Sequence, residues 1–409
     1  MFNSLLKEGS LTTIFPGGGR VTYGTGEPHV TIRLHDRRAV VKLALNPDLQ
    51  LGELYMDGRL TVEEGGDVTD LLALLMRNLS LTQPSGLHRA TRMLRNATRK
   101  IAQFNPARRA KRNVAHHYDL SGDLYARFLD RDRQYSCAYF PRGDETLEEA
   151  QIAKKRHIAS KLLLDRPGMK VLDIGCGWGG LALDLARDTG ANVLGVTLSE
   201  EQIAVARERS EKARLSERCR FELADYRALS GIYDRIVSVG MFEHVGVPHY
   251  RQFFGKVRQL LADDGVMLLH TIGRLDGAGS TNPWIAKYIF PGGYVPSLSE
   301  LTRAVEKSGL LITDIEILRL HYAKTLVEWR RRFLAQRAEI AKIYDERFCR
   351  MWEFYLIGAE MAFRHDHEVI FQVQLAKQQE ALPLTRDYML DAERSMKFAG
   401  VGPRPVRAA

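Results

Sequence analysis

A glycine-rich loop is the part of this sequence best suited to hold a ligand. Residues 173–180 read DIGCGWGG, and they follow an apolar run and open a helical pattern. Glycines at positions 175, 177 and 179 let the backbone pass close to a bound group, where a side chain would collide with it. Dinucleotide-binding folds use the same device, so the loop alone does not identify the ligand. A tight turn with no ligand is the alternative interpretation.

The strand ends near this loop favour S-adenosylmethionine over NAD. The loop has the spacing G-x-G-x-G, with the helix opening directly behind it, rather than G-x-G-x-x-G. The next strand ends in GVTLSEEQ (residues 195–202) and lacks the terminal acid that normally binds the ribose of NAD. Thr197, Ser199 and Gln202 offer neutral hydrogen bonds there instead. Asp225, after the third strand, can accept from an adenine amino group, or it is only a helix cap.

Alternating strand and helix patterns must position these residues. Strand-like runs occupy residues 169–174, 191–198, 218–224, 234–240 and 265–272, with helical patterns between them. This alternation predicts an α/β fold with a mostly parallel sheet. Residues 1 to about 80 predict a smaller α+β unit. In it, residues 30–36 and 39–45 have strand patterns, and residues 67–79 have a helical pattern with Asp67 or Thr69 near its start.

Length and composition suit a peripheral or soluble two-domain protein. The chain has 409 residues, of which 45% are hydrophobic. Its four cysteines are widely spread and form no CxxC pair, which predicts neither a disulfide framework nor a structural zinc site. The first residues lack the long apolar core of a signal peptide. No stretch approaches the roughly 20 apolar residues that are needed to cross a bilayer.

The positive charge is concentrated in residues 77–112, which we call the basic segment. It contains eight Arg and two Lys and no acidic residue, whereas the whole chain has a net charge of +9. The spacing of its residues would give a helix one cationic and one apolar face, formed by Arg89, Arg92, Arg95 and Arg99 and by Met93, Ala97, Ile101 and Phe104. Three interpretations stay open: a linker helix packed on its own protein, contact with an anionic membrane, and contact with nucleic acid.

Several blocks of sequence together resemble the cyclopropane-fatty-acyl-phospholipid synthase family. They occur in family order over about 280 residues and read YSCAYF (135–140), VLDIGCGWGG, GVTLSEEQ, VSVGMFEHVG (237–246), HTIG (270–273), PWIAKYIFPGGYVPS (283–297) and HYAKTLVEWRRRF (321–333). The resemblance implies a class I methyltransferase, with a Rossmann-like, seven-stranded, mostly parallel sheet and a smaller N-terminal α+β domain. We expect the α+β domain at residues 1–80, a basic linker at 81–112, the catalytic domain at 113–395 and a disordered tail at 396–409.

The resemblance also implies a reaction. The methyl group of S-adenosylmethionine is attacked by the cis double bond of an acyl chain, and the resulting carbocation loses a methyl proton so that a cyclopropane ring closes. In this family the base is thought to be bound bicarbonate, and the matching positions here are Cys137, Glu243, His270, Ile272 through its backbone N–H, and Tyr322. Glu243 can accept from the O–H of bicarbonate, and the others can donate to its oxygens.

The expected cofactor residues combine the motif and the resemblance. They are Tyr135, Ser136, Asp173, Gly175, Gly177, Trp178, Gly179, Thr197, Ser199, Gln202, Asp225 and Tyr226. Aromatic faces attract cations, and the candidates for stabilising the carbocation are Tyr135, Phe242, Tyr288, Phe290, Tyr294 and Tyr322. Each of these aromatic residues is equally well explained as ordinary core. No HExxH or comparable spacing accompanies Glu243 and His244, so no metal is expected.

One departure from the family affects the mechanism. Many relatives carry a Cys five residues before the Arg of an AFR block, and here Ala359 stands at that position, so a covalent cysteine route through it is impossible.

The alternative functions are a methyl-branched or methylene acyl product and, from another class, a nucleoside-binding protein without chemistry. The expected partners are an unsaturated phospholipid in an anionic bacterial membrane, reached from its cytoplasmic face, and a second copy of the chain, but not nucleic acid.

Overall fold

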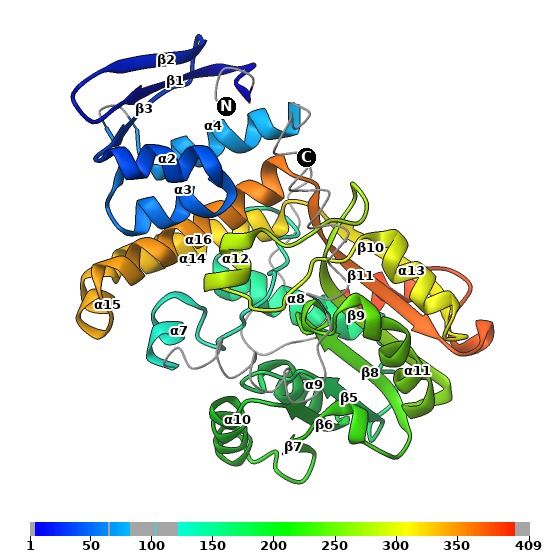
Figure 1. Cartoon of the computed structure of the whole chain (residues 1–409). Coiled ribbons are helices and arrows are strands. Elements are labelled where there is room, and N and C mark those ends of the chain that lie inside the picture. The colour runs from blue at the N-terminus through cyan, green and yellow to red at the C-terminus, as the bar shows by residue number, and fades with distance from the viewer. Residues whose placement is uncertain (1–4, 64–65, 82–102, 104–121, 397–409) are drawn as a thin grey trace. The chain divides into compact units, whose positions relative to one another are not determined.

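The computed structural model describes residues 5–63, 66–81, 103 and 122–396 (Figure 1). The chain forms two compact units, each containing one β-sheet. The large-sheet unit comprises residues 100–278, 292–321 and 369–409, and the small-sheet unit comprises residues 1–99, 279–291 and 322–368. Most of the basic segment and residues 397–409 lie outside the described residues, so the structure does not address the predicted linker helix or the predicted tail.

The large-sheet unit is built on a seven-stranded sheet with the order β10-β11-β9-β8-β5-β6-β7 (Figure 1). Its strands β5 to β9 pair in parallel, and β10 pairs with β11 antiparallel. The predicted α/β fold with a mostly parallel seven-stranded sheet is therefore confirmed. The strands are β5 (Lys170–Ile174), β6 (Asn192–Thr197), β7 (Cys219–Leu223), β8 (Tyr233–Val239), β9 (Leu261–Arg274), β10 (Leu311–Leu318) and β11 (Glu368–Ala376).

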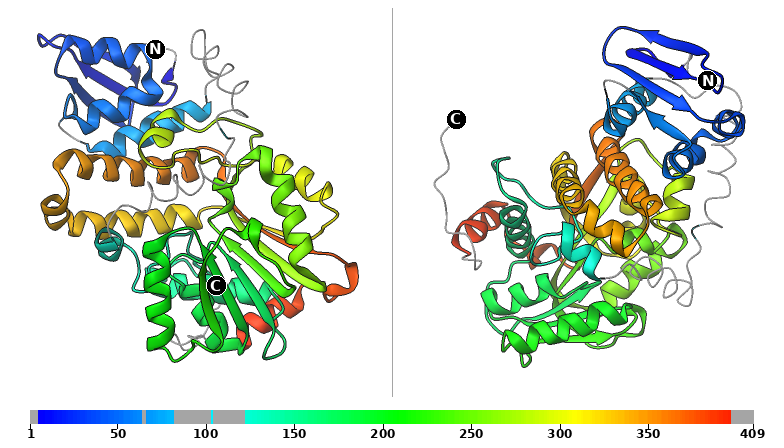
Figure 2. Two further views of the ribbon diagram at one scale, coloured as in Figure 1. Left: turned by 60° about the horizontal axis from the view of Figure 1, so that its bottom comes forward. Right: turned by 90° about the vertical axis from the view of Figure 1, so that its left-hand side faces the viewer.

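Helices cover both faces of this sheet because the central strands are apolar on both sides (Figure 2). Val171 packs into the cluster beneath one set of helices, and its neighbour Leu172 packs into the cluster on the opposite face. The first face is covered by α8 (Leu147–Lys161), α9 (Gly180–Thr189) and α10 (Glu200–Lys212). The second is covered by α11 (Tyr250–Leu260) and α13 (Leu298–Glu306). Two further helices, α7 (Gly122–Phe128) and α17 (Asp387–Ser395), belong to the same unit.

The small-sheet unit has a four-stranded sheet with the order β2-β1-β3-β4. Its strands are β1 (Gly9–Ile14), β2 (Arg20–Thr25), β3 (His29–Leu34) and β4 (Leu60–Val62), and the helices packed with them from the N-terminal region are α2 (Arg37–Leu45), α3 (Pro47–Met56) and α4 (Val68–Leu81). Later parts of the chain add α12 (Pro283–Tyr288), α14 (His321–Ala335), α15 (Arg337–Ile343) and α16 (Glu346–His365). The predicted helix at 67–79 is confirmed, with Asp67 accepting from the Thr69 amide.

Two features of the small-sheet unit differ from the sequence-based expectation. Residues 39–45 form part of helix α2 rather than a strand, because Asp36 caps the helix and Ala39 and Leu43, four residues apart, are buried on one side. Residues 279–291 and 322–368 cluster with the N-terminal residues, although the sequence-based division placed them in the catalytic domain. The large apolar side chains explain this, since Trp284 of α12 packs on Phe354 of α16 and on Met56.

No helix in the described part of the chain is long and apolar enough to span a membrane.

Candidate functional site

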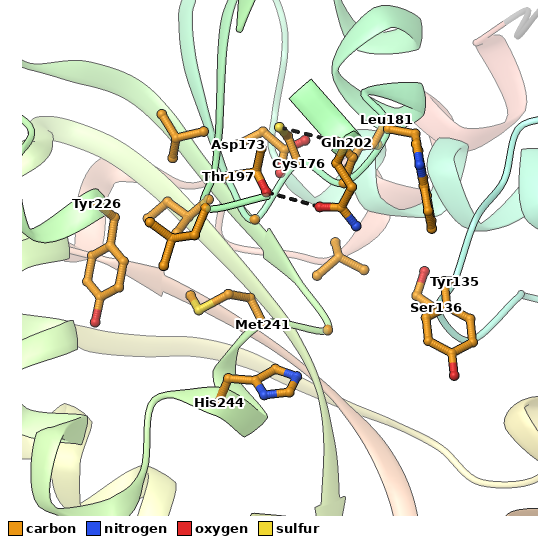
Figure 3. Close-up of a pocket in the computed structure, with 18 of the residues that line it drawn as sticks. Tyr135, Ser136, Asp173, Cys176, Leu181, Thr197, Gln202, Tyr226, Met241 and His244 are labelled. Atoms are coloured by element: carbon orange, nitrogen blue, oxygen red, sulfur yellow. Dashed lines mark hydrogen bonds between the residues drawn. The ribbon is translucent and has the colours of Figure 1, made fainter. Parts of the chain in front are cut away.

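A pocket in the large-sheet unit lies where β5, β6 and β8 end, with the loop after β7 on its rim. In Figure 3, Tyr226 lies on one side of this pocket and Tyr135 and Ser136 on the other. The carboxyl ends of parallel strands are the usual ligand-binding edge of such a sheet. The predicted cofactor residues that line the pocket are Tyr135, Ser136, Asp173, Gly175, Gly177, Trp178, Thr197, Gln202, Asp225 and Tyr226.

The three glycines of the loop are needed for different reasons. Gly177 has a φ of +54°, and a Cβ there would have no atom of the described residues within 4 Å, so it faces open pocket. Gly179 caps α9, and a Cβ there would come within 2.7 Å of the Phe221 ring. A Cβ on Gly175 would come within 2.9 Å of Met241. Gly177 is therefore the position where a side chain would compete with a ligand, and Gly179 serves packing.

Neutral polar groups follow β6, as the sequence suggested. The Thr197 hydroxyl donates to Gln202 Oε1 over 3.0 Å, which leaves the Gln202 amide nitrogen as a donor in the pocket wall. Ser199 instead caps α10, since its Oγ accepts from the backbone N–H of Gln202. The structure thus gives Ser199 a helix-capping contact rather than a place in the pocket lining.

Asp225 is held by its neighbour Arg227. The carboxylate accepts from Arg227 Nε over 2.8 Å and from Nη2 over 2.6 Å, and it also caps a short 3₁₀ turn, η1 (Tyr226–Ala228). Burial opposes ionisation, but the Arg227 contacts outweigh it and lower the pKa of Asp225. The cap that the sequence left as an alternative is therefore present, on a residue that also lines the pocket.

Asp173 ends β5 with a buried carboxylate. Its Oδ2 has no hydrogen-bond partner among the described residues, and burial raises the pKa of Asp173 to about 7, although the charge of Lys154 acts in the opposite direction. A buried polar atom without a partner is costly and is commonly a ligand-binding atom. This oxygen is therefore a candidate acceptor for a cationic or N–H group of a bound cofactor.

The segment carrying Tyr135 and Ser136 is fixed by Lys154, a fully buried residue of α8. Lys154 Nζ donates to Gln134 Oε1 and, over 3.1 Å, to Ser136 Oγ. Burial lowers the pKa of Lys154 to about 8. Tyr135 packs edge-on against Tyr125, which in turn contacts Trp178, so aromatic rings support the same wall.

Glu243 and Ile272 meet beside the pocket. Glu243 lies in a 3₁₀ turn, η2 (Phe242–His244), between the pocket-lining residues Met241 and His244. The Ile272 amide donates to Glu243 Oε1 over 2.6 Å, whereas Glu243 Oε2 is buried and has no partner among the described residues. Burial raises the pKa of Glu243. The Ile272 N–H, which was expected to face bicarbonate, is thus used here to orient the carboxylate.

His270 lies on β9, two residues before Ile272, and is almost fully buried. Its carbonyl accepts from the Gly240 amide, which ties β9 to the start of the segment carrying Glu243. Gln372 Nε2 lies 3.1 Å from His270 Nδ1, and His270 Nε2 has no partner in the described part of the chain. Burial, aided by the charges of Lys154 and Lys161, lowers the pKa of His270 well below its usual value, so the ring is neutral.

The remaining predicted residues do not line the pocket. Cys137 is buried, follows the pocket-lining Ser136 and interacts electrostatically with Lys154. Tyr322 belongs to the small-sheet unit, where its ring packs on Phe363 and Trp329. Among the carbocation candidates, Phe242 and Tyr294 are core residues, and Tyr288 and Phe290 belong to the small-sheet unit.

Sequence reasoning missed further residues of this region, and four of them illustrate why. Met241 and His244 line the pocket, Lys154 holds one wall, and Gln372 contacts His270. Burial lowers the pKa of His244 to about 4, so it is neutral. The neighbouring GMFEHV block could have indicated Met241 and His244, but no spacing marks Lys154 or Gln372. The described residues contain no cluster of three or more metal-ligating side chains.

Comparisons with family models and with known proteins identify the same family. The family model described as mycolic acid cyclopropane synthetase matches residues 105–373, and a domain family of unknown function matches residues 2–83. The chain is 40% identical to the cyclopropane-fatty-acyl-phospholipid synthase of Escherichia coli strain K12 over 354 residues, which cover 86% of this chain and 89% of the relative. It is 38% identical to the tuberculostearic acid methyltransferase UfaA1 of Mycobacterium tuberculosis, covering 80% of this chain and 78% of the relative.

A solved structure of mycolic acid cyclopropane synthase CmaA1, in complex with SAH and CTAB, is also similar. It has a TM-score of 0.61 and 36% sequence identity, and the match covers 67% of this chain and 99% of that one. This match agrees with the fold described above. The chain belongs to the mycolic acid cyclopropane synthetase family and is an S-adenosylmethionine-dependent methyltransferase.

Proposed function

We propose that this enzyme converts the cis double bond of an unsaturated acyl chain in a membrane phospholipid into a cyclopropane ring. The observation that carries the proposal is a pair of buried polar atoms, Glu243 Oε2 and His270 Nε2, that have no hydrogen-bond partner among the described residues. A neutral histidine with its proton on Nε2 donates from that atom, and a carboxylate accepts. Such a pair fits a small oxyanion that carries its own O–H group.

The cofactor residues fit S-adenosylmethionine. Gly177 leaves open space for the backbone to contact a ligand, and Asp173 offers a buried acceptor without a partner among the described residues. The side-chain amide of Gln202 and the carboxylate of Asp225 would hold the polar parts of the nucleoside. Bound S-adenosylmethionine supplies an electrophilic methyl group.

The residues beside the pocket fit bicarbonate as the second small group. Glu243 would accept from its O–H, and His270 would donate to one of its oxygens. Cys137 and Tyr322 complete the set that the family resemblance implies. Bound bicarbonate would supply a base in a site where His270 is a poor one, because burial lowers its pKa and its Nδ1 already contacts Gln372.

The protein's own contribution is to orient these groups and exclude water. Ile272 fixes the Glu243 carboxylate, and the buried surroundings of His270 hold its ring neutral. Preorganised donors in a dry site stabilise developing charge better than mobile water does. Burial of Glu243 and His270 limits the access of water that would capture a carbocation, which favours ring closure.

Purified enzyme provides the direct test. It is incubated with S-adenosylmethionine and vesicles of a monounsaturated phospholipid, and the acyl chains are analysed by mass spectrometry. The proposal predicts an acyl product that gains one methylene and survives mild hydrogenation. Vesicles of the corresponding saturated lipid are the control and should yield no product. Methylation of a headgroup, or of neither lipid, would overturn the proposal.

A methyl-branched product is the second candidate. The similarity to the tuberculostearic acid methyltransferase UfaA1 favours keeping it in view. The same incubation separates the two outcomes through mild hydrogenation. Methyl transfer followed by proton loss gives either a cyclopropane or an isomeric methyl-branched or methylene alkene of the same mass, and only the alkene then takes up two hydrogens.

A further inference from the structure

A buried chain of polar side chains approaches His270 from the side of β11. Gln372, which is fully buried on that strand, lies with its Nε2 3.1 Å from His270 Nδ1. Its Oε1 accepts from Lys161 Nζ of helix α8 over 2.7 Å. Lys161 also contacts the Glu316 carboxylate, and Glu316 accepts from His157 over 2.7 Å. Every member of this chain belongs to the large-sheet unit.

The ion pair fixes which way the Gln372 amide points. Burial opposes ionisation of Glu316, but His157 and Lys161 lower the pKa of this carboxyl to about 2, so it is ionised. Burial lowers the pKa of Lys161, whereas the contact with the Glu316 carboxylate acts in the opposite direction and favours the ammonium form. An ammonium only donates hydrogen bonds, so the group of Gln372 that faces Lys161 must be the carbonyl oxygen. The amide NH₂ therefore faces His270.

The direction of the amide sets the tautomer of His270. An NH₂ group donates, so His270 Nδ1 must accept and carries no proton. In a neutral ring the proton then resides on Nε2, the atom without a partner among the described residues. A histidine ring nitrogen is metallated or protonated according to the hydrogen bond that its other nitrogen makes, and the same logic applies here.

We propose that Gln372, oriented by Lys161, is a positioning residue that holds His270 in the Nε2–H tautomer, so that His270 serves as a hydrogen-bond donor to an oxyanion. The donor role rests on the proposed function, whereas the tautomer itself does not. Without Gln372, Nδ1 could carry the proton, and Nε2 would present a lone pair that repels an oxyanion.

The test combines nitrogen NMR with kinetics. The parent, labelled with ¹⁵N-histidine, should show His270 with a protonated Nε2 and an unprotonated Nδ1, and His270→Gln identifies the signals by their loss. Gln372→Glu preserves the shape but places a second acceptor against Nδ1, so Nδ1 should become protonated. Turnover should fall about 100-fold, the scale of losing one preorganised donor, with S-adenosylmethionine affinity unchanged.

Gln374 provides a matched control on the same strand. It is equally buried, and it bonds the Lys161 carbonyl and the Tyr388 hydroxyl rather than His270. Gln374→Glu should leave the His270 tautomer as in the parent. Gln372→Met removes the donor without adding charge and should yield mixed tautomers, so the proposal remains testable if Gln372→Glu fails to fold.

Three results would overturn the inference. These are a protonated Nδ1 in the parent, an unchanged Nε2–H tautomer in both Gln372 variants, and an equal loss of turnover in Gln372→Glu and Gln374→Glu. If the tautomer changes as predicted while the parent makes no cyclopropane, the positioning role stands and the proposed function fails.

Discussion

At the scale of single residues, the environment of Glu243 defines what it can do. One carboxylate oxygen accepts the Ile272 amide, and the other is buried without a partner in the described part of the chain. Leaving a buried acceptor unsatisfied costs about 1–3 kcal/mol, and natural proteins retain such atoms mainly where a ligand completes them. Glu243 is therefore poised to accept a hydrogen bond from a bound group.

Glu243→Gln should separate binding from turnover. The amide would present donors where the carboxylate only accepts, so it would contact the O–H of bicarbonate unfavourably. We expect a turnover loss of about 100-fold or more, with S-adenosylmethionine affinity close to that of the parent. Calorimetry and initial rates measure the two quantities, and equal rates for variant and parent would refute the role. Adding bicarbonate to depleted parent enzyme should raise its activity, but not that of the variant.

His157 should make stability depend on pH. Burial alone would lower its pKa, but hydrogen bonds to Glu316 and Glu393 outweigh burial and raise the pKa of His157 above its usual value of about 6.5. A raised pKa in the folded state stabilises the fold fully below about pH 6.5, and this contribution is lost as pH rises through the folded-state pKa.

Thermal unfolding of the parent and His157→Gln tests this pH dependence. Between about pH 6 and about pH 9, the midpoint of the parent should fall more than that of the variant, because the parent loses the His157 proton in addition to the protons that both proteins lose. Parallel pH profiles for the two proteins would show that His157 contributes no such linkage. His157 is remote in sequence from the loop, so cofactor affinity near pH 6 serves as the check on folding.

At the scale of elements, the β5–α9 loop and the turn after β8 converge on one pocket. Sequence periodicity predicted the parallel strands and the loop, because strand patterns and glycine spacing are local signals. It could not predict that Lys154 of α8 would fix the Tyr135–Ser136 segment, since this hydrogen bond joins residues 18 positions apart that no shared motif links. Gln372 and His270 are 102 positions apart and have no shared motif.

Gly177→Ala tests the loop as a cofactor site better than a change at Gly175. A side chain on Gly175 would strike Met241, whereas a Cβ on Gly177 enters open pocket. We expect at least a tenfold loss of S-adenosylmethionine affinity, equivalent to about 1.4 kcal/mol. Both positions have a positive φ, so strain of about 1–2 kcal/mol accompanies any substitution.

Gly168→Ala is the matched control for that strain. Gly168 also has a positive φ with no described atom near its Cβ, and it lies outside the pocket lining. The two variants should lose similar thermal stability, and only Gly177→Ala should lose affinity. Calorimetry that gives both variants parental affinity would remove the loop from the cofactor site.

At the scale of the whole molecule, the sequence and the fold agree on two units but divide the chain differently. The family blocks predicted the large sheet, whereas the membership of residues 279–291 and 322–368 depends on long-range packing such as that of Trp284 on Phe354. The error at residues 39–45 arose because a short apolar run fits either a strand or a helix. Membrane attachment by the basic segment remains a proposal, since most of the segment lies outside the described residues.

We propose that the basic segment attaches the enzyme to an anionic membrane. Each Lys or Arg near such a surface contributes on the order of 1 kcal/mol, and salt screens this contribution. Binding to vesicles rich in anionic lipid should weaken, and become less salt-sensitive, in a variant with Gln at Arg89, Arg92, Arg95 and Arg99. Co-sedimentation at low salt measures it.

A charge-matched control separates the segment from net charge. It replaces four exposed cations of the large-sheet unit by Gln, namely Arg166, Lys212, Arg218 and Arg220. This variant should bind vesicles nearly as well as the parent. Equal binding by all three proteins would mean that the segment is only a linker, and attention would turn to Arg330, Arg331 and Arg332.

The most direct test of the central claim follows the methyl hydrogens. Purified enzyme is given S-adenosylmethionine with a fully deuterated methyl group, together with monounsaturated phospholipid vesicles, and the acyl product is analysed by mass spectrometry. Ring closure removes one methyl hydrogen, so the account predicts a hydrogenation-resistant product that retains two deuterium atoms. A branched product that retains three deuterium atoms would contradict it.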